Sequence, residues 1–239
     1  MDLRDPTRAV TATLDGPVLA VLANVGKPLT VGEVTAQMPR GSEIGVRRSL
    51  ARLVEQGIVT ATEMGRNRVH ELNRDHVAAQ IAVQLASLRL ELWRRLRAKL
   101  SGWRIKPLYA SVFGSAARED GDAGSDIDLL LVHAPLPGES DPRRGSATLG
   151  RQLAGLAAEL TTLQLTEKDA ARWRSQVDQL HHEVRSWTGN PLQVIQMSGY
   201  EWGDHKRQGT SLYTEISRDG IQVAGETGDP LAALLKASG

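Results

Sequence analysis

The chain has 239 residues, 24% of them charged, and its formal net charge at pH 7 is +1. This length suits one large domain or two small ones. The near-neutral balance excludes a uniformly basic coat for nucleic acid, so any such contact needs a local basic patch. The absence of cysteine excludes disulfides, thiolate zinc sites and cysteine nucleophiles. No apolar stretch could cross a bilayer and the N-terminus lacks a signal-peptide core, so we expect a cytoplasmic protein without a membrane partner.

The first 74 residues predict three short helices and a β-hairpin. "GPVLAVLANVG" (16–26) is apolar and ends in glycine, and "LTVGEVTAQM" (29–38) has Thr30 and Glu33 at the spacing of a capping box. A third helix begins after Ser42 and ends at Gly57. Its apolar residues recur at helical spacing: Ile44, Val46, Leu50, Leu53 and Val54. The segments "IVTATEM" and "RVHELN" flank "GRN", which is typical of a tight turn between two strands.

This order of elements resembles a winged helix-turn-helix of the arsenic-repressor or multiple-antibiotic-repressor type, over roughly residues 14–73. The similarity is strongest in "RRSLARLVEQGIV" (47–59). The resemblance implies double-stranded DNA as a partner, with the third helix in the major groove and the hairpin beside it. The candidate DNA-binding residues lie on the outer side of that helix and at the hairpin tip: Arg47, Arg48, Arg52, Arg66 and Arg68. The alternative is that these arginines form a solvated face and the domain binds a protein.

Residues 75–103 predict one amphipathic helix of about 40 Å. Its apolar residues step by three or four: Ile81, Leu85, Leu88, Leu92, Leu96 and Leu100. Such a stripe can pair with its copy in a homodimer, or it can pack on its own domain. We therefore expect an N-terminal domain (1–74), a linker or dimerisation helix (75–104) and a C-terminal domain (105–239).

The C-terminal domain predicts strands that alternate with helices. The expected strands are "PLYASVFGS" (107–115), "SDIDLLLVH" (125–133) and "NPLQVIQMS" (190–198). Helices are expected over 145–160 and 170–189. Around Asp219 and Gly220 the pattern fits either a strand pair or a helix end followed by a strand. The fold class predicted for the whole chain is α+β with two domains.

Two aspartates enter the apolar strand that follows a Gly-Ser pair. Residues i and i+2 of a strand face the same side, so we expect Asp126 and Asp128 to point together. Two neighbouring carboxylates repel, and a divalent cation such as Mg²⁺ offsets this. Gly114 lets a phosphate approach the backbone and Ser115 offers a hydroxyl. The alternative is that Asp126 caps a turn and Asp128 forms a surface ion pair.

Gly114-Ser115 followed by "SDIDL" (125–129) is similar to the signature of the DNA polymerase beta-like nucleotidyltransferases, over about residues 108–225. The closest likeness is to minimal and aminoglycoside nucleotidyltransferase domains, with a mixed sheet and helices. The resemblance implies an NTP as substrate or ligand and Mg²⁺ as cofactor. It also implies Asp126 and Asp128 as metal-binding and catalytic residues. The nucleotide-binding residues would be Gly114, Ser115, Ser125 and Gln193.

One position departs from that family's pattern. The third carboxylate is replaced by Gln193, which carries no charge. Glu183 and Glu201 are candidate substitutes. We expect a DNA-binding transcriptional regulator whose nucleotidyltransferase-like domain binds Mg-NTP and can transfer NMP to an acceptor. The alternatives are an enzyme that modifies a protein, RNA or small molecule and is targeted by the winged domain, or a catalytically degenerate scaffold.

Overall fold

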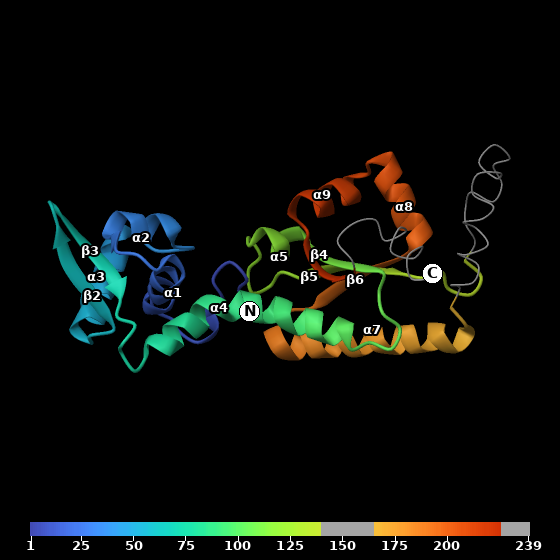
Figure 1. The fold of residues 1–239 in the computed structure, drawn as a ribbon, viewed down its shortest axis with the longest axis horizontal. Helices are drawn as coiled ribbons and strands as arrows, with labels where there is room; N and C mark the ends of the chain where they lie inside the picture. Colours follow the sequence, from blue (N-terminus) through green and yellow to red (C-terminus); the bar gives the residue numbers. More distant parts are fainter. Residues whose placement is uncertain (140–164, 226–239) are drawn as a thin grey trace. The chain divides into compact units, whose positions relative to one another are not determined.

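The computed structural model describes residues 1–139 and 165–225 (Figure 1). Helices and two sheets make up the described chain, which confirms the predicted α+β class. It divides into two compact units, of which unit 1 comprises Met1–Leu92 with Asp122–Gly124, and unit 2 comprises Trp93–Gly121 and the described residues from Ser125 onward. The helix expected over 145–160 lies outside the described residues. Among the described helices, none is long and apolar enough to span a membrane.

Unit 1 contains helices and a small antiparallel sheet. After a 3-10 turn at Pro6–Ala9, its helices are α1 (Asp15–Val25), α2 (Val31–Gln37) and α3 (Glu43–Glu55). The sheet has the strand order β1 (Leu29–Thr30), β3 (Asn67–Leu72), β2 (Val59–Met64). Met64 pairs with Asn67, so Gly65 and Arg66 alone form the turn, and Asn67 belongs to the strand. The helices and the hairpin expected from the sequence are therefore present.

The local signals at the helix ends operate as expected. The Thr30 hydroxyl oxygen accepts a hydrogen bond from the Glu33 N–H (3.3 Å), and the Glu33 carboxylate accepts one from the Thr30 N–H (2.7 Å). Ser42 caps α3 by accepting from the Gly45 N–H (3.3 Å). Gly26 ends α1 in the left-handed conformation with φ 64°. These contacts confirm the predicted capping box, the predicted end of α1 at Gly26 and the predicted start of α3 after Ser42.

One apolar residue of the α3 pattern does not share the buried face of the helix. Ile44 is 64% exposed, whereas Val46, Leu50 and Leu53 are buried. Val46 lies two residues after Ile44, a step that turns a helix by about 200°, so the two side chains cannot face the same core. Ile44 therefore lies on the solvent side of α3.

Helix α4 (Ala79–Ser101) begins four residues later than expected. The preceding residues form turns instead, in which the Asn73 side chain accepts from the Asp75 N–H (3.2 Å) and His76 Nδ1 accepts from the Ala78 N–H (3.1 Å). At the usual rise its 23 residues span about 35 Å rather than 40 Å. The boundary between the two units falls within this helix, after Leu92.

The apolar stripe of α4 is only partly buried. Leu92, Leu96 and Leu100 are at most 3% exposed, while Ile81 is 58% exposed. Lys99 forms an ion pair with Glu183 of α7 (Glu167–Thr188), at 2.6 Å. The C-terminal half of the stripe therefore packs within its own chain, as one of the two interpretations predicted, and pairing through the N-terminal half remains a prediction.

Unit 2 is built on a mixed four-stranded sheet. Its order is β6 (Leu192–Ser198), β5 (Ile127–His133), β4 (Tyr109–Phe113), β7 (Ile221–Gly225). Strands β5 and β6 are parallel, and β4 is antiparallel to β5 and to β7. The helices are α5 (Gly114–Arg118), α7 (Glu167–Thr188), α8 (Gly199–Gln208) and α9 (Ser211–Asp219). A helix end followed by a strand therefore occupies the region around Asp219.

Both faces of this sheet are covered. Helices α8 and α9 lie on one face, and α7 lies on the other (Figure 1). On the first face Leu130 and Val132 of β5 pack with Trp202 of α8 and Ile216 of α9. Asp128 lies two residues before Leu130 on β5, so its side chain faces the same side as Leu130 and Val132. The central strand thus carries a carboxylate at one end of a face that is otherwise apolar.

Helix α5 ends at Glu119 in a left-handed backbone conformation, which substitutions at this residue can test. Glu119 is the one non-glycine residue with positive φ (63°) in the described chain. A left-handed residue with a Cβ costs about 1 kcal/mol. We therefore expect the free energy of unfolding of Glu119→Gly to be about 1 kcal/mol larger than that of Glu119→Ala. In urea denaturation the glycine variant should then unfold at the higher concentration. Both variants lose the Glu119 side chain, so the comparison isolates the backbone, and equal stabilities would contradict the assigned conformation.

Candidate functional site

The Gly-Ser turn and the acidic strand meet in space. Phe113, the last residue of β4, pairs with Asp128 of β5, and the chain then turns at Gly114 with φ 67°. A Cβ placed on Gly114 would overlap the Asp128 carboxylate and would lie 3.2 Å from its Cγ. Only glycine fits at this position, for both steric and conformational reasons. The structure therefore brings Gly114 and Asp128 together.

Ser115 and Ser125 lie near the same loop residue. A Cβ placed on Gly121 would be 3.1 Å from the Ser115 hydroxyl oxygen and 3.5 Å from the Ser125 Cβ. The Gly121 N–H also donates to the Ser115 carbonyl (3.3 Å). The loop after α5 thus folds back over the start of that helix, next to the residue that precedes Asp126.

Asn190 fixes the entry to β5 and was not expected from the sequence. It is fully buried, and its side-chain amide donates to the Ser125 carbonyl (2.9 Å). The neighbouring Pro191 carbonyl accepts from the Ile127 N–H (2.9 Å). The short link between α7 and β6 therefore holds the chain on both sides of Asp126. An asparagine beside a proline reads as an ordinary turn, so the sequence contains no signal of this contact.

The two aspartates influence one another. Asp126 lies directly before β5, and both side chains are half-buried. Burial raises the pKa of Asp128 above its ordinary value, and the charges of Asp126 and Glu215 raise it further, while Arg118 lowers it. A simple surface ion pair would lower the pKa of Asp128. Asp126 therefore lies near enough for its charge to act on Asp128, and a shared ligand for the two carboxylates stays a prediction.

Arg118 and Glu215 complete the charged cluster and were not expected from the sequence. Arg118 of α5 forms an ion pair with Glu215 of α9 (2.7 Å) and a longer one with Asp120 (3.3 Å). Arg118 lies three residues after Ser115, and this basic residue so near the expected phosphate turn was a usable signal. Glu215 lies far along the chain with no motif around it, so only the tertiary structure reveals it.

Gln193 is the lateral neighbour of Asp128. The two residues pair across the parallel strands β5 and β6, so their side chains lie on the same face. Gln193 is exposed. The structure places neither candidate substitute acid here, because Glu183 pairs with Lys99 and Glu201 closes the capping box of α8 with Ser198 (2.7 Å), at the other end of β6.

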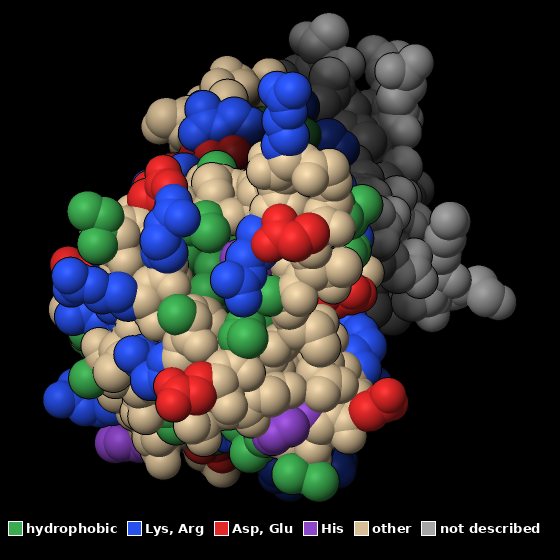
Figure 2. All heavy atoms as spheres, turned by 90° about the vertical axis from the view of Figure 1, so that its left-hand side faces the viewer, with side chains coloured by type: hydrophobic (Ala, Val, Ile, Leu, Met, Phe, Trp, Pro, Cys, Tyr) green, Lys and Arg blue, Asp and Glu red, His purple; other side chains and the backbone are tan. Residues whose placement is uncertain are grey.

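The predicted DNA-binding arginines lie in unit 1. Figure 2 shows Lys and Arg side chains spread over the face of this unit that carries the hairpin. Arg47 is 66% exposed and pairs with Glu43 one turn earlier (2.8 Å). Arg52 instead donates to Asp15 of α1 (3.2 Å from Nε), which also accepts from the Ser49 hydroxyl (2.6 Å). Arg52 therefore links α3 to α1, a structural contact that helical periodicity alone did not indicate.

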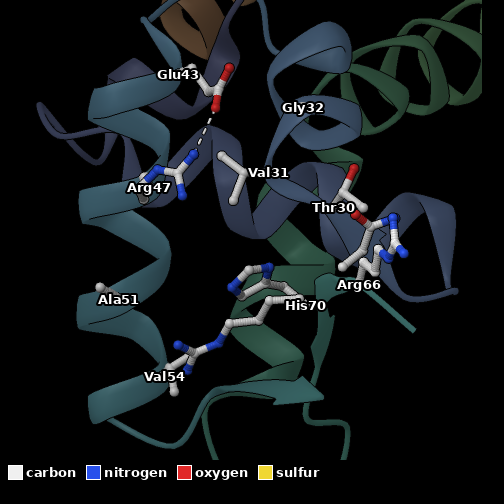
Figure 3. Close-up of a pocket in the computed structure, with 11 residues that line it drawn as sticks. Thr30, Val31, Gly32, Glu43, Arg47, Ala51, Val54, Arg66 and His70 are labelled. Atoms are coloured by element: carbon white, nitrogen blue, oxygen red, sulfur yellow. Dashed lines mark hydrogen bonds and ion pairs between the residues drawn. The ribbon is translucent and has the colours of Figure 1, made fainter. Parts of the chain in front are cut away.

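Three of these arginines line one hollow. The hollow has a volume of about 470 Å³ and lies between the start of α2, α3 and the hairpin (Figure 3). Arg47, Arg66 and Arg68 line it, together with His70 of β3. Arg48 is exposed on α3 and does not belong to this lining. His70 was not expected from the sequence, where it appears as one residue of a hairpin strand.

The raised pKa of Asp128 predicts that Asp128→Asn increases the stability of the fold in a pH-dependent way. Because the folded chain favours the protonated carboxyl, wild-type stability falls as pH rises above the ordinary value of 3.8 through the raised pKa. We expect Asp128→Asn to be more stable than wild type at neutral pH by about 0.5 kcal/mol after solvent screening, and equal to it at strongly acidic pH. Thermal unfolding without divalent cations measures this, with Asp178→Asn on the exposed side of α7 as control. A loss of stability at neutral pH would contradict the repulsion.

Asp126 and Asp128 thus form a pair of carboxylates rather than a complete set of protein ligands. Within residues 1–139 and 165–225, no group of three or more His, Asp or Glu side chains is placed to hold a metal ion. Comparison of the chain with protein-family models, with curated proteins and with solved structures finds no match.

Proposed function

We propose that the chain is a DNA-binding transcriptional regulator whose unit 2 binds a magnesium nucleoside triphosphate. The observation that carries this proposal is the close approach of Gly114 to the Asp128 carboxylate. It brings a backbone turn without a side chain next to one of the two neighbouring aspartates, and Ser115 follows that turn directly. A triphosphate needs donors for its oxygens, and its metal needs carboxylate oxygens, so these groups suit both parts of one ligand.

The charges of the cluster support a divalent cation. Burial and the neighbouring acids raise the pKa of Asp128, so the pair carries more negative charge than its surroundings stabilise. Mg²⁺ binds one or two carboxylates and completes its shell with phosphate and water, so Asp126 and Asp128 suffice as protein ligands. When bound, the ion would neutralise charge on the phosphates. Arg118, whose charge lowers the pKa of Asp128, would contribute a second positive charge.

Unit 1 supports the DNA-binding part of the proposal. The sequence of α1, α2 and α3 followed by the β2–β3 hairpin suits a winged helix-turn-helix. Exposed arginines on α3 and on the hairpin could contact phosphates or guanine edges. Ile44, which is exposed on α3, offers an apolar contact for a thymine methyl group.

Transfer of NMP is a second candidate function, favoured by Glu215. In such a reaction an acceptor oxygen bonds to the α-phosphorus, the bond from that phosphorus to the β-phosphate bridging oxygen breaks, and pyrophosphate leaves. The proton of the acceptor must pass to a base. Gln193 cannot accept it, whereas Glu215 brings a third carboxylate close enough to affect Asp128. If Glu215 does not act in this way, unit 2 is a nucleotide-binding scaffold.

The nucleotide proposal predicts magnesium-dependent binding of NTPs. We expect the double variant Asp126→Asn/Asp128→Asn to bind a fluorescent NTP analogue at least about tenfold more weakly than wild type in Mg²⁺. Without Mg²⁺ the two proteins should differ little. Asp178→Asn serves as the matched control because it removes an exposed carboxylate elsewhere in unit 2. Equal binding by wild type and the double variant would refute the assigned site.

The same samples distinguish binding from transfer. Each α-labelled NTP is incubated with the protein and candidate acceptors, and release of pyrophosphate is measured. Loss of label transfer in Glu215→Gln, with NTP affinity retained, would support the catalytic candidate. Tight binding without transfer of any nucleotide would favour the scaffold.

The DNA proposal predicts a salt-dependent interaction. We expect Arg47→Ala and Arg66→Ala each to reduce affinity for genomic duplex by about tenfold near ~0.1 M salt and to reduce the salt slope by about 1, as for loss of one phosphate contact. Arg174→Ala on the exposed side of α7 is the control and should change neither quantity. Fluorescence anisotropy over a salt series measures both. Wild type that binds no duplex would indicate that unit 1 binds a protein.

A further inference from the structure

The hollow of unit 1 is positively charged from more than one side. Arg47 extends from α3, and Figure 3 shows it and His70 directed toward the same space from facing elements. Arg66 and Arg68 come from the hairpin. Of the nearby acids, Glu43 pairs with Arg47 on α3, and Glu33 of α2 is held by Thr30 and the charge of Lys27. Glu63 lies across the hairpin from Arg68. The lining itself carries three arginines and one acid, so its net charge is positive.

His70 lines this hollow, but its Nδ1 is covered by protein. The residue is 5% exposed, and its Nδ1 is buried without a hydrogen-bond partner within the described structure. Burial lowers the pKa of His70, the neighbouring Leu29 backbone raises it, and the charges of Arg68 and Arg47 lower it, with a net lowering from 6.5. The free chain therefore favours the neutral imidazole. A ligand in the hollow would act on this ring through its charge.

We infer that this hollow binds one phosphodiester group of duplex DNA, and that His70 takes up a proton when it does. The inference rests on the proposed DNA binding and identifies one of its contacts. A phosphate between Arg47, Arg66 and Arg68 offsets the arginine charges that, after burial, lower the pKa of His70. Its negative charge also favours the protonated imidazole directly.

The surroundings favour a phosphate of duplex DNA over a free anion. The hollow opens between α3 and the hairpin, the two elements expected to contact the duplex. Exposed apolar side chains also occur on both elements outside the lining, Ile44 on α3 and Met64 at the end of β2. Such groups suit the apolar parts of a large ligand and have no use for inorganic phosphate.

Proton uptake makes affinity depend on pH. With bound phosphate the pKa of His70 is higher than in the free chain, where it lies below 6.5. The association constant therefore rises as pH falls through the bound-state pKa and levels off below the free-state pKa, with a limit of about tenfold per pH unit for one proton.

Anisotropy titrations of a labelled duplex with the full chain, from about pH 8 to about pH 5.5, test this linkage. We expect His70→Gln to lose most of the pH dependence of wild type. His76→Gln removes another imidazole from the same unit and should retain it. Equal pH dependence in wild type and His70→Gln would overturn the inference, provided that circular dichroism shows both substituted proteins to be folded.

NMR titration of the wild-type imidazoles tests the same point without a substitution. We expect the pKa of His70 to rise by about one unit or more when duplex DNA binds. DNA binding that leaves this pKa unchanged would overturn the inference alone, whereas no binding at any pH would overturn the proposed function as well. A rise caused by inorganic phosphate but not by duplex would refute the assignment to DNA.

Discussion

The candidate site of unit 2 depends on one close approach. At Gly114 the backbone passes so near the Asp128 carboxylate that no side chain can stand between them. This contact follows from the register of β4 and β5, which pairs Phe113 with Asp128 and leaves the next residue to turn away. Every other feature proposed for the site, from the Ser115 hydroxyl to the Arg118 charge, takes its position from that turn.

Both proposed sites leave polar groups in an unfavourable state in the free chain. Asp128 is half-buried near two other acids, and His70 is buried near two arginines. In each case a ligand of opposite charge would relieve the cost, which is the usual logic by which perturbed groups indicate function. The neighbouring charges are negative around Asp128 and positive around His70, so a cation suits unit 2 and an anion suits unit 1.

Local signals in the sequence predicted much of the fold. The Thr30 and Glu33 spacing, the glycine after α1 and the apolar run of β5 each depend on neighbouring residues, and the structure confirms them. The family resemblance also placed Gln193 on a strand beside the acids, and the register of β5 and β6 pairs it with Asp128. Such predictions succeed because caps and pleats are set by short-range geometry.

The failures share a different cause. The Arg52 contact with Asp15, the Arg118 contact with Glu215 and the Asn190 contact with Ser125 all join residues that are distant in sequence. No spacing rule links such pairs, because the fold as a whole decides which side chains meet. Ile44 differs for a local reason, since the apolar pattern groups it with buried residues of α3 although its helical angle points away from the core.

The short link from Thr188 to Pro191 has a consequence for sequence change in this protein. Its amide and carbonyl groups hold Ser125 and Ile127 directly, so the spacing between α7 and β6 is coupled to the placement of the strand entry. Inserting or deleting a single residue there would shift these anchors by several ångströms. The length of this link should therefore be under tighter constraint than its amino-acid identities, with Asn190 as the exception.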